Sequence, residues 1–141
     1  MTIGVSHISE FIERNGKRVN LIIWDLGGQP RFDVLHPAYV NQASGALLMF
    51  DMAAIETLEQ LNKWADLLRR YNGDALPMVL VGAKVDLIAG QDTLDEVYAV
   101  ATQKMQELAI NDICVTSSKV NYNVSETIEY LVDYLVWFAD Q

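Results

Sequence analysis

The stretch from Leu21 to Gln29 constrains the fold more than any other, because an apolar run ends there in an Asp-x-x-Gly-Gln turn. The run Leu21–Trp24 predicts a buried strand. Asp25 stands where this strand should end, and the two glycines after it allow a tight turn or the close approach of a ligand. A carboxylate at a strand's C-terminal end, beside a glycine-rich loop, suits a magnesium–phosphate group. The same pattern also occurs in ordinary strand-to-loop junctions, so its meaning depends on the rest of the chain.

Composition sets the class of protein. The chain has 141 residues, of which 51% are hydrophobic and 21% charged, which predicts a single globular domain over residues 1–141. Nineteen acidic and ten basic residues give a formal charge of −9, which argues against a nucleic-acid surface or a polybasic membrane anchor. One cysteine, Cys114, predicts no disulfide and a reducing compartment. Neither a signal peptide nor a membrane-spanning run is visible, so we expect a cytoplasmic protein without an integral membrane segment.

Strand and helix signals alternate along the chain after an opening hairpin, whose turn is predicted at Asn15-Gly16. The predicted strands are His7–Arg14, Lys17–Trp24, Ala46–Phe50, Met78–Gly82 and Ile113–Thr116. One helix is predicted at Glu56–Tyr71. A second is predicted to start at a Thr93/Glu96 capping box, and a third after a cap at Asn123. The continuous apolar run Ala46–Phe50 predicts a strand buried on both faces. The alternation predicts an α/β fold, a mostly parallel sheet flanked by helices on both faces, with ligand loops at the strands' C-terminal ends.

Five segments, in order, resemble motifs of the Ras-superfamily small GTPases. Trp24–Gln29 followed by Arg31-Phe32 resembles the second switch region. The other four are Thr2–Val5 (end of the first switch), Phe50-Asp51 (end of the following strand), Gly82–Leu87 (guanine-specificity loop) and Thr116–Lys119 (last base-contacting loop). The resemblance implies a P-loop NTPase-like G domain that acts as a signal-transducing switch and hydrolyses GTP with Mg²⁺. Thr2–Val5 and Asp51–Trp64 look Rab- or Ras-like, whereas the second switch looks Arf-like.

The resemblance assigns the phosphate side of the site to four residues. Thr2 and Asp25 would hold magnesium, although Thr2 is equally open to interpretation as a disordered terminal residue. The Gly28 amide would contact the terminal phosphate, and Gln29 would orient the attacking water, with hydrolysis accelerated by a partner's arginine finger.

The base side is assigned to four others. The Asp86 carboxylate would accept the two N–H groups of guanine's base edge, a paired contact that adenine cannot supply. Lys84 would lay its aliphatic stem along the purine face. The Ser118 amide would meet the guanine carbonyl oxygen, and Lys119 would cover the base.

Two departures weaken the expected switch. Ala83 stands where the family normally has asparagine, or sometimes threonine, so a donor to the purine ring and a brace between loops are lost. The 141 residues also contain no Gly-x-x-x-x-Gly-Lys-Ser/Thr, the P-loop that cradles the phosphates, nor its strand and first helix. Truncation is the favoured origin, and a strand-swapped homo-oligomer is another possible outcome. We expect weak nucleotide binding and negligible GTPase activity for this chain.

Two functions from different classes stay open. The first is a switch that binds GTP or GDP with Mg²⁺ and meets regulator or effector proteins at its second switch region. The second is a nucleotide-free scaffold that presents the same region as a protein-interaction module. Phe32, Leu35 and Tyr39 suit either internal packing or such a partner surface.

Overall fold

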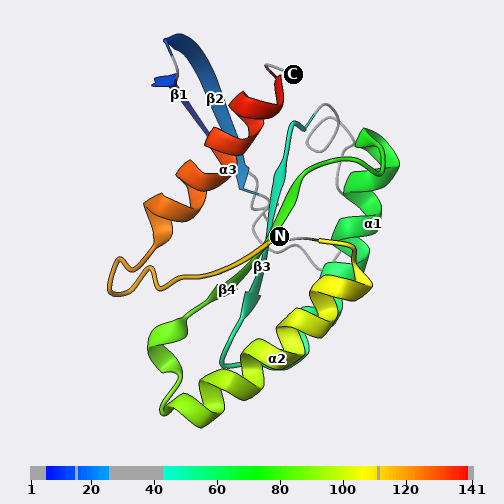
Figure 1. The fold of residues 1–141 in the computed structure, drawn as a ribbon, viewed down its shortest axis with the longest axis vertical. Helices are drawn as coiled ribbons and strands as arrows, with labels where there is room; N and C mark the ends of the chain where they lie inside the picture. Colours follow the sequence, from blue (N-terminus) through cyan, green and yellow to red (C-terminus); the bar gives the residue numbers. More distant parts are fainter. Residues whose placement is uncertain (1–5, 15, 26–42, 111, 140–141) are drawn as a thin grey trace. The chain divides into compact units, whose positions relative to one another are not determined.

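The computed structural model describes residues 6–14, 16–25, 43–110 and 112–139 (Figure 1). The chain divides into two compact units, Met1–Asn41 and Gln42–Gln141. The single domain expected from composition stays a prediction.

The first unit contains an antiparallel hairpin of β1 (Ser6–Arg14) and β2 (Lys17–Asp25). Arg14 pairs with Lys17, which leaves two residues for the turn, and Gly16 has the left-handed φ of 75° that such turns require. The predicted hairpin is therefore confirmed. Asp25 is the last residue of β2, at the strand end where the sequence places it.

The second unit contains a parallel sheet with the strand order β3-β4-β5. Its strands are β3 (Ala46–Asp51), β4 (Met78–Ala83) and β5 (Asp112–Val115). Its helices are α1 (Leu61–Asn72), α2 (Gln91–Glu107) and α3 (Val124–Ala139), with short 3-10 helices η3 (Ile55–Gln60) and η4 (Val85–Leu87). Helices α1 and α2 lie on one side of the sheet and α3 on the other (Figure 1). The expected α/β fold, a parallel sheet flanked by helices, is confirmed for this unit.

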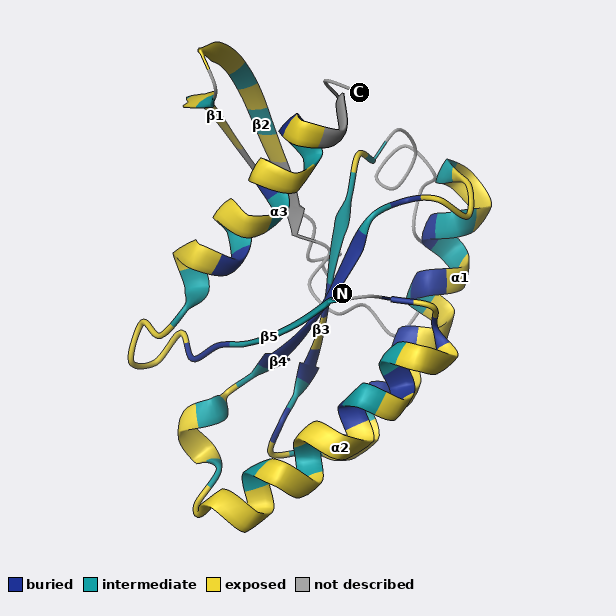
Figure 2. Ribbon diagram, in the orientation of Figure 1, coloured by how far each residue is buried: buried dark blue, intermediate teal, exposed yellow. Residues whose placement is uncertain are grey.

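Strand β4 forms the centre of the core, with Leu80 and Val81 exposed by only 0% and 1% (Figure 2). Strand β3 differs from the prediction that it is buried on both faces. Leu48 and Phe50 are buried, but Met49 between them is 56% exposed. Because neighbouring side chains point to opposite faces of a strand, Met49 lies on the face opposite to Leu48 and Phe50, and the described elements leave this position of that face exposed.

The predicted cap of α2 is wrong. Helix α2 begins at Gln91 after Gly90, which has φ 85°, and makes no side-chain cap hydrogen bond. Thr93 therefore lies inside the first turn. Helix α3 begins directly after Asn123, as expected, and Asn123 Nδ2 donates to the Val115 carbonyl oxygen at 3.1 Å. None of the helices in the described ranges is long and apolar enough to cross a membrane.

Candidate functional site

The three loops of the candidate site begin where three parallel strands end. Asp51 pairs with Ala83 across β3 and β4, and Gly82 pairs with Val115 across β4 and β5. The carboxyl ends of parallel strands meet at one edge, so the residues that follow them gather there. This placement comes from the strand register alone.

A short hydrogen bond joins the loop after β4 to the loop after β5. Ser117 Oγ donates to Asp86 Oδ1 at 2.5 Å. Ser117 is fully buried, whereas Asp86 in η4 is exposed. Two backbone bonds support this link: Val85 N donates to the Thr116 oxygen at 3.0 Å, and Thr116 N donates to the Gly82 oxygen at 2.8 Å. The buried Ser117 hydroxyl therefore orients the Asp86 carboxylate, which stays accessible to a ligand.

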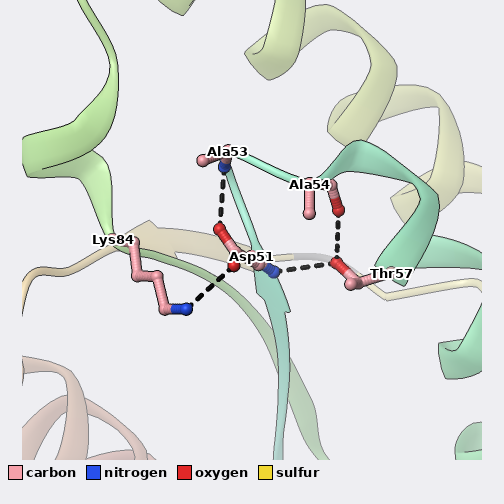
Figure 3. Close-up of polar contacts among 5 residues, drawn as sticks. All are labelled: Asp51, Ala53, Ala54, Thr57 and Lys84. Carbon is pink, nitrogen blue, oxygen red and sulfur yellow. Dashed lines mark hydrogen bonds and ion pairs between the residues drawn. The ribbon is translucent and has the colours of Figure 1, made fainter.

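Lys84 directly follows β4, and its side chain reaches the end of β3. Its backbone has the left-handed φ of 63°, which is uncommon for a residue with a long side chain. Its Nζ forms an ion pair with Asp51 Oδ2 at 3.0 Å (Figure 3). The hydrogen bond from Lys84 is the main cause that lowers the pKa of Asp51, and partial desolvation opposes it. Asp51 therefore stays ionised and holds the ammonium group of Lys84.

Ser118 and Lys119 lie in the tight loop after β5. The loop is closed by a pair of backbone bonds, Ser117 N to the Tyr122 oxygen at 3.0 Å and Tyr122 N to the Ser117 oxygen at 2.7 Å. Asn121 has the left-handed φ of 53°, which lets the chain reverse within this loop. Ser118 and Lys119 are both exposed, next in sequence to the Ser117 hydroxyl that holds Asp86.

The structure thus brings the predicted base-side residues to one edge of the sheet, in adjoining loops; they are Lys84, Asp86, Ser118 and Lys119. Asp25 is the last residue of β2, in the other unit, and the structure does not describe its side chain. Thr2, Gly28 and Gln29 lie outside the described residues. Within the described ranges, no group of three or more His, Cys, Asp or Glu side chains could hold a metal ion. The phosphate and magnesium roles therefore stay predictions.

Two residues of this edge received no role from the sequence. Ser117 comes directly before the predicted base-contacting Ser118, and its hydroxyl is the group that orients Asp86. Asp51 follows an apolar strand, the same signal that singled out Asp25. The sequence motif assigned Asp51 only to the end of a strand, and the signal used for Asp25 would also have marked its carboxylate as a candidate site group.

A parallel sheet with polar loops at the carboxyl ends of its strands is the arrangement of nucleotide-binding α/β proteins. A sequence model of the Ras family matches residues 1–136. The chain belongs to this family of small GTPases.

Several Rab proteins are similar to the chain. Mouse Ras-related protein Rab-12 is 34% identical over 133 residues, which are 94% of this chain and 53% of that protein. Human Ras-related proteins Rab-3A and Rab-3B are 31% and 34% identical, over 95% and 94% of this chain and 59% and 58% of their own lengths. The chain therefore spans somewhat more than half the length of these relatives. The Rab-like character is supported, whereas the Arf-like character of the second switch stays a prediction.

Proposed function

We propose that this chain is the guanine-recognising part of a Rab-like GTP-binding switch. The observation that carries the proposal is the Asp86 carboxylate, held at 2.5 Å by the buried Ser117 hydroxyl at the C-terminal edge of the sheet. A carboxylate that is oriented before the ligand arrives loses little freedom on binding, which favours affinity and selectivity.

The proposed chemistry of the base site follows from the donor and acceptor groups. Asp86 accepts the ring N–H and the amino N–H of guanine, whereas adenine presents no such pair of donors. The aliphatic stem of Lys84 packs on the purine face, and Lys119 covers the base from the next loop. The Ser118 amide donates to the guanine carbonyl oxygen.

On the phosphate side, Mg²⁺ when bound would neutralise phosphate charge and polarise the phosphoryl oxygens. Thr2 and Asp25 would hold it, Gly28 would contact the terminal phosphate, and Gln29 would orient the water. The 141 residues contain no Gly-x-x-x-x-Gly-Lys-Ser/Thr, and their formal charge of −9 opposes an anionic ligand. We therefore propose weak nucleotide binding and negligible GTP hydrolysis by this chain, with regulators and effectors meeting the second switch region.

The first test of the proposal is nucleotide content. The purified chain is denatured, and any released nucleotide is identified by chromatography. The refolded or empty protein is then titrated with fluorescent GDP and Mg²⁺, with fluorescent ADP as the comparison ligand. We expect saturable GDP binding that is clearly tighter than ADP binding. Equal affinity for the two nucleotides would contradict guanine recognition.

A change of base preference tests Asp86 itself. Asp86→Asn should weaken GDP binding by about ten- to a hundred-fold, because one charge-assisted pair of hydrogen bonds is lost. The same variant should gain affinity for xanthosine diphosphate, whose carbonyl oxygen replaces the amino group of guanine and can accept from the asparagine amide. Asp66→Asn, an equivalent change at an exposed position of α1, is the matched control. GDP binding that Asp86→Asn leaves unchanged would place the base elsewhere.

The second candidate function is a nucleotide-free scaffold that acts as a protein-interaction module. Ala83 favours it, because alanine supplies neither the donor to the purine nor the brace between loops. Purified protein that contains no nucleotide and shows no saturable GDP binding would select this candidate. Light scattering of the same sample tests the strand-swapped homo-oligomer, which predicts twice the mass of one chain.

A further inference from the structure

Asp51 has no role in the function proposed above, although it makes more hydrogen bonds than Lys84, Asp86, Ser118 or Lys119, the predicted site residues whose side chains the structure describes. We infer that Asp51 is a positioning residue for the base site, which holds the Lys84 side chain in place and substitutes for the brace that Ala83 cannot provide. This inference rests on the proposed function, and it concerns how the site is kept in its binding conformation.

Asp51 is a firm anchor because the turn after β3 holds one of its carboxylate oxygens and its backbone nitrogen, which leaves the other carboxylate oxygen for Lys84 (Figure 3). Oδ1 accepts from Ala53 N at 2.8 Å, while Oδ2 is 3.0 Å from Lys84 Nζ. Asp51 N donates to Thr57 Oγ1 at 2.9 Å, and Thr57 Oγ1 donates to the Ala54 oxygen at 2.7 Å. The turn after β3 therefore orients the Asp51 carboxylate independently of its ion pair with Lys84.

Lys84 needs such an anchor. Its side chain is 59% exposed and has four rotatable carbon–carbon bonds, so an unpaired ammonium group would sample many positions. The backbone of Lys84 is also left-handed, a conformation that most residues avoid. The ion pair with Asp51 selects among these positions and keeps the aliphatic stem at the C-terminal edge of the sheet.

The link also joins two loops. Met52 N donates to the Ala83 oxygen at 3.0 Å, which continues the β3–β4 pairing by one step beyond the strands. Beyond that step, Ala83 has no polar side-chain atom with which to tie its loop to a neighbour. The Asp51–Lys84 pair spans this position and connects the turn after β3 with the base loop after β4.

The test compares Asp51→Asn with the unchanged chain and with Asp66→Asn as the control. Asparagine keeps the acceptor for Ala53 N but removes the charge that holds Lys84. We expect GDP affinity to fall about two- to five-fold in low salt, with a smaller difference in high salt, because the pair is partly exposed. In a Lys84→Met background the effect of Asp51→Asn should disappear. An equal loss in both backgrounds, or no loss in either, would overturn the inference.

A second comparison tests the substitution for the missing brace. In an Ala83→Asn background, whose amide can tie the loops, Asp51→Asn should cost less affinity than it does beside alanine. An unchanged cost would show that Asp51 does not compensate for Ala83.

Amide hydrogen exchange separates this inference from the proposed function. Exchange at Val85 and Leu87 in the empty protein needs no nucleotide, and we expect it to quicken in Asp51→Asn but not in Asp66→Asn. If the chain binds no GDP but amide exchange is faster in Asp51→Asn, the proposed function fails, while the inference that Asp51 holds Lys84 in place is supported. Exchange that stays the same in Asp51→Asn would overturn the brace whether or not GDP binds.

Discussion

Ser117→Ala tests the contact on which the base site depends. Ser117 is fully buried, and its hydroxyl donates to Asp86 Oδ1 at 2.5 Å and accepts from Val120 N at 3.4 Å. A hydrogen bond to a charged group contributes about 1.5–3 kcal/mol. Because Asp86 is exposed, its carboxylate can regain water in the variant, and the long bond from Val120 adds little. We therefore expect a loss of about 1–2 kcal/mol in the free energy of unfolding.

The loss is measured by thermal unfolding followed by circular dichroism. For a chain of this size, 1–2 kcal/mol corresponds to a fall in Tm of about 3–8 °C. Ser44→Ala, at an exposed bend before β3, is the matched control and should leave Tm within about 1 °C, as surface changes usually do. Under the proposed function, GDP binding by Ser117→Ala should also weaken, because Asp86 loses its orientation.

A double-mutant cycle assigns the loss to the Ser117–Asp86 contact. In an Asp86→Asn background the charge-assisted bond is already weakened, so Ser117→Ala should cost clearly less than it does beside the carboxylate. The reasoning would be refuted if Ser117→Ala melted at the same temperature as the unchanged chain. It would also be refuted if the cost were the same in both backgrounds.

Two further variants test the core and the link between η3 and α2. Gly82→Ala should cost about 1–2 kcal/mol in the free energy of unfolding by overpacking, because the new Cβ would lie 2.9 Å from Met52 Cγ and Sδ; urea denaturation measures this cost. Lys104→Met should cost about 1 kcal/mol at pH 7, since the buried ammonium lies 3.3 Å from Glu59 and 3.0 Å from Glu107, both of which are exposed. The glutamates raise the pKa of Lys104 above its ordinary 10.5, so the stabilisation is complete below that value and is lost as pH rises through the raised pKa. Melting curves of both proteins should therefore converge at strongly alkaline pH, and a constant difference would contradict this assignment.

Local patterns predicted most of the second unit and the hairpin. Within the predicted helix Glu56–Tyr71, four apolar residues recur at helical spacing and all four are buried; they are Leu58, Leu61, Ala65 and Leu68. The Asn15-Gly16 pair identified the hairpin turn, because such turns require residues that accept positive φ. These features depend on neighbours within a few residues, so the sequence contains the information that determines them.

Features that depend on contacts across the fold were harder to predict. The exposure of Met49 depends on which elements cover each face of β3, and its apolar neighbours are the same in either case. Helix α2 starts at Gln91, directly after Gly90 with its positive φ and two residues before the predicted cap at Thr93. An apolar run or a capping pattern is compatible with several tertiary surroundings, and packing chooses among them.

In the candidate site, too, the sequence predicted local features but not the contacts between distant residues. The alternation of strands and helices predicted which loops share an edge, because parallel strands end together. It could not predict how those loops are joined, since the two decisive contacts link residues 33 and 31 positions apart, Lys84 with Asp51 and Ser117 with Asp86. Both contacts hold a charged side chain of the loop after β4 by a group from a neighbouring loop. The geometry of the proposed base site is therefore set from two sides, by a carboxylate on one and a buried hydroxyl on the other, and altering either group should disturb guanine binding even though neither is proposed to touch the base.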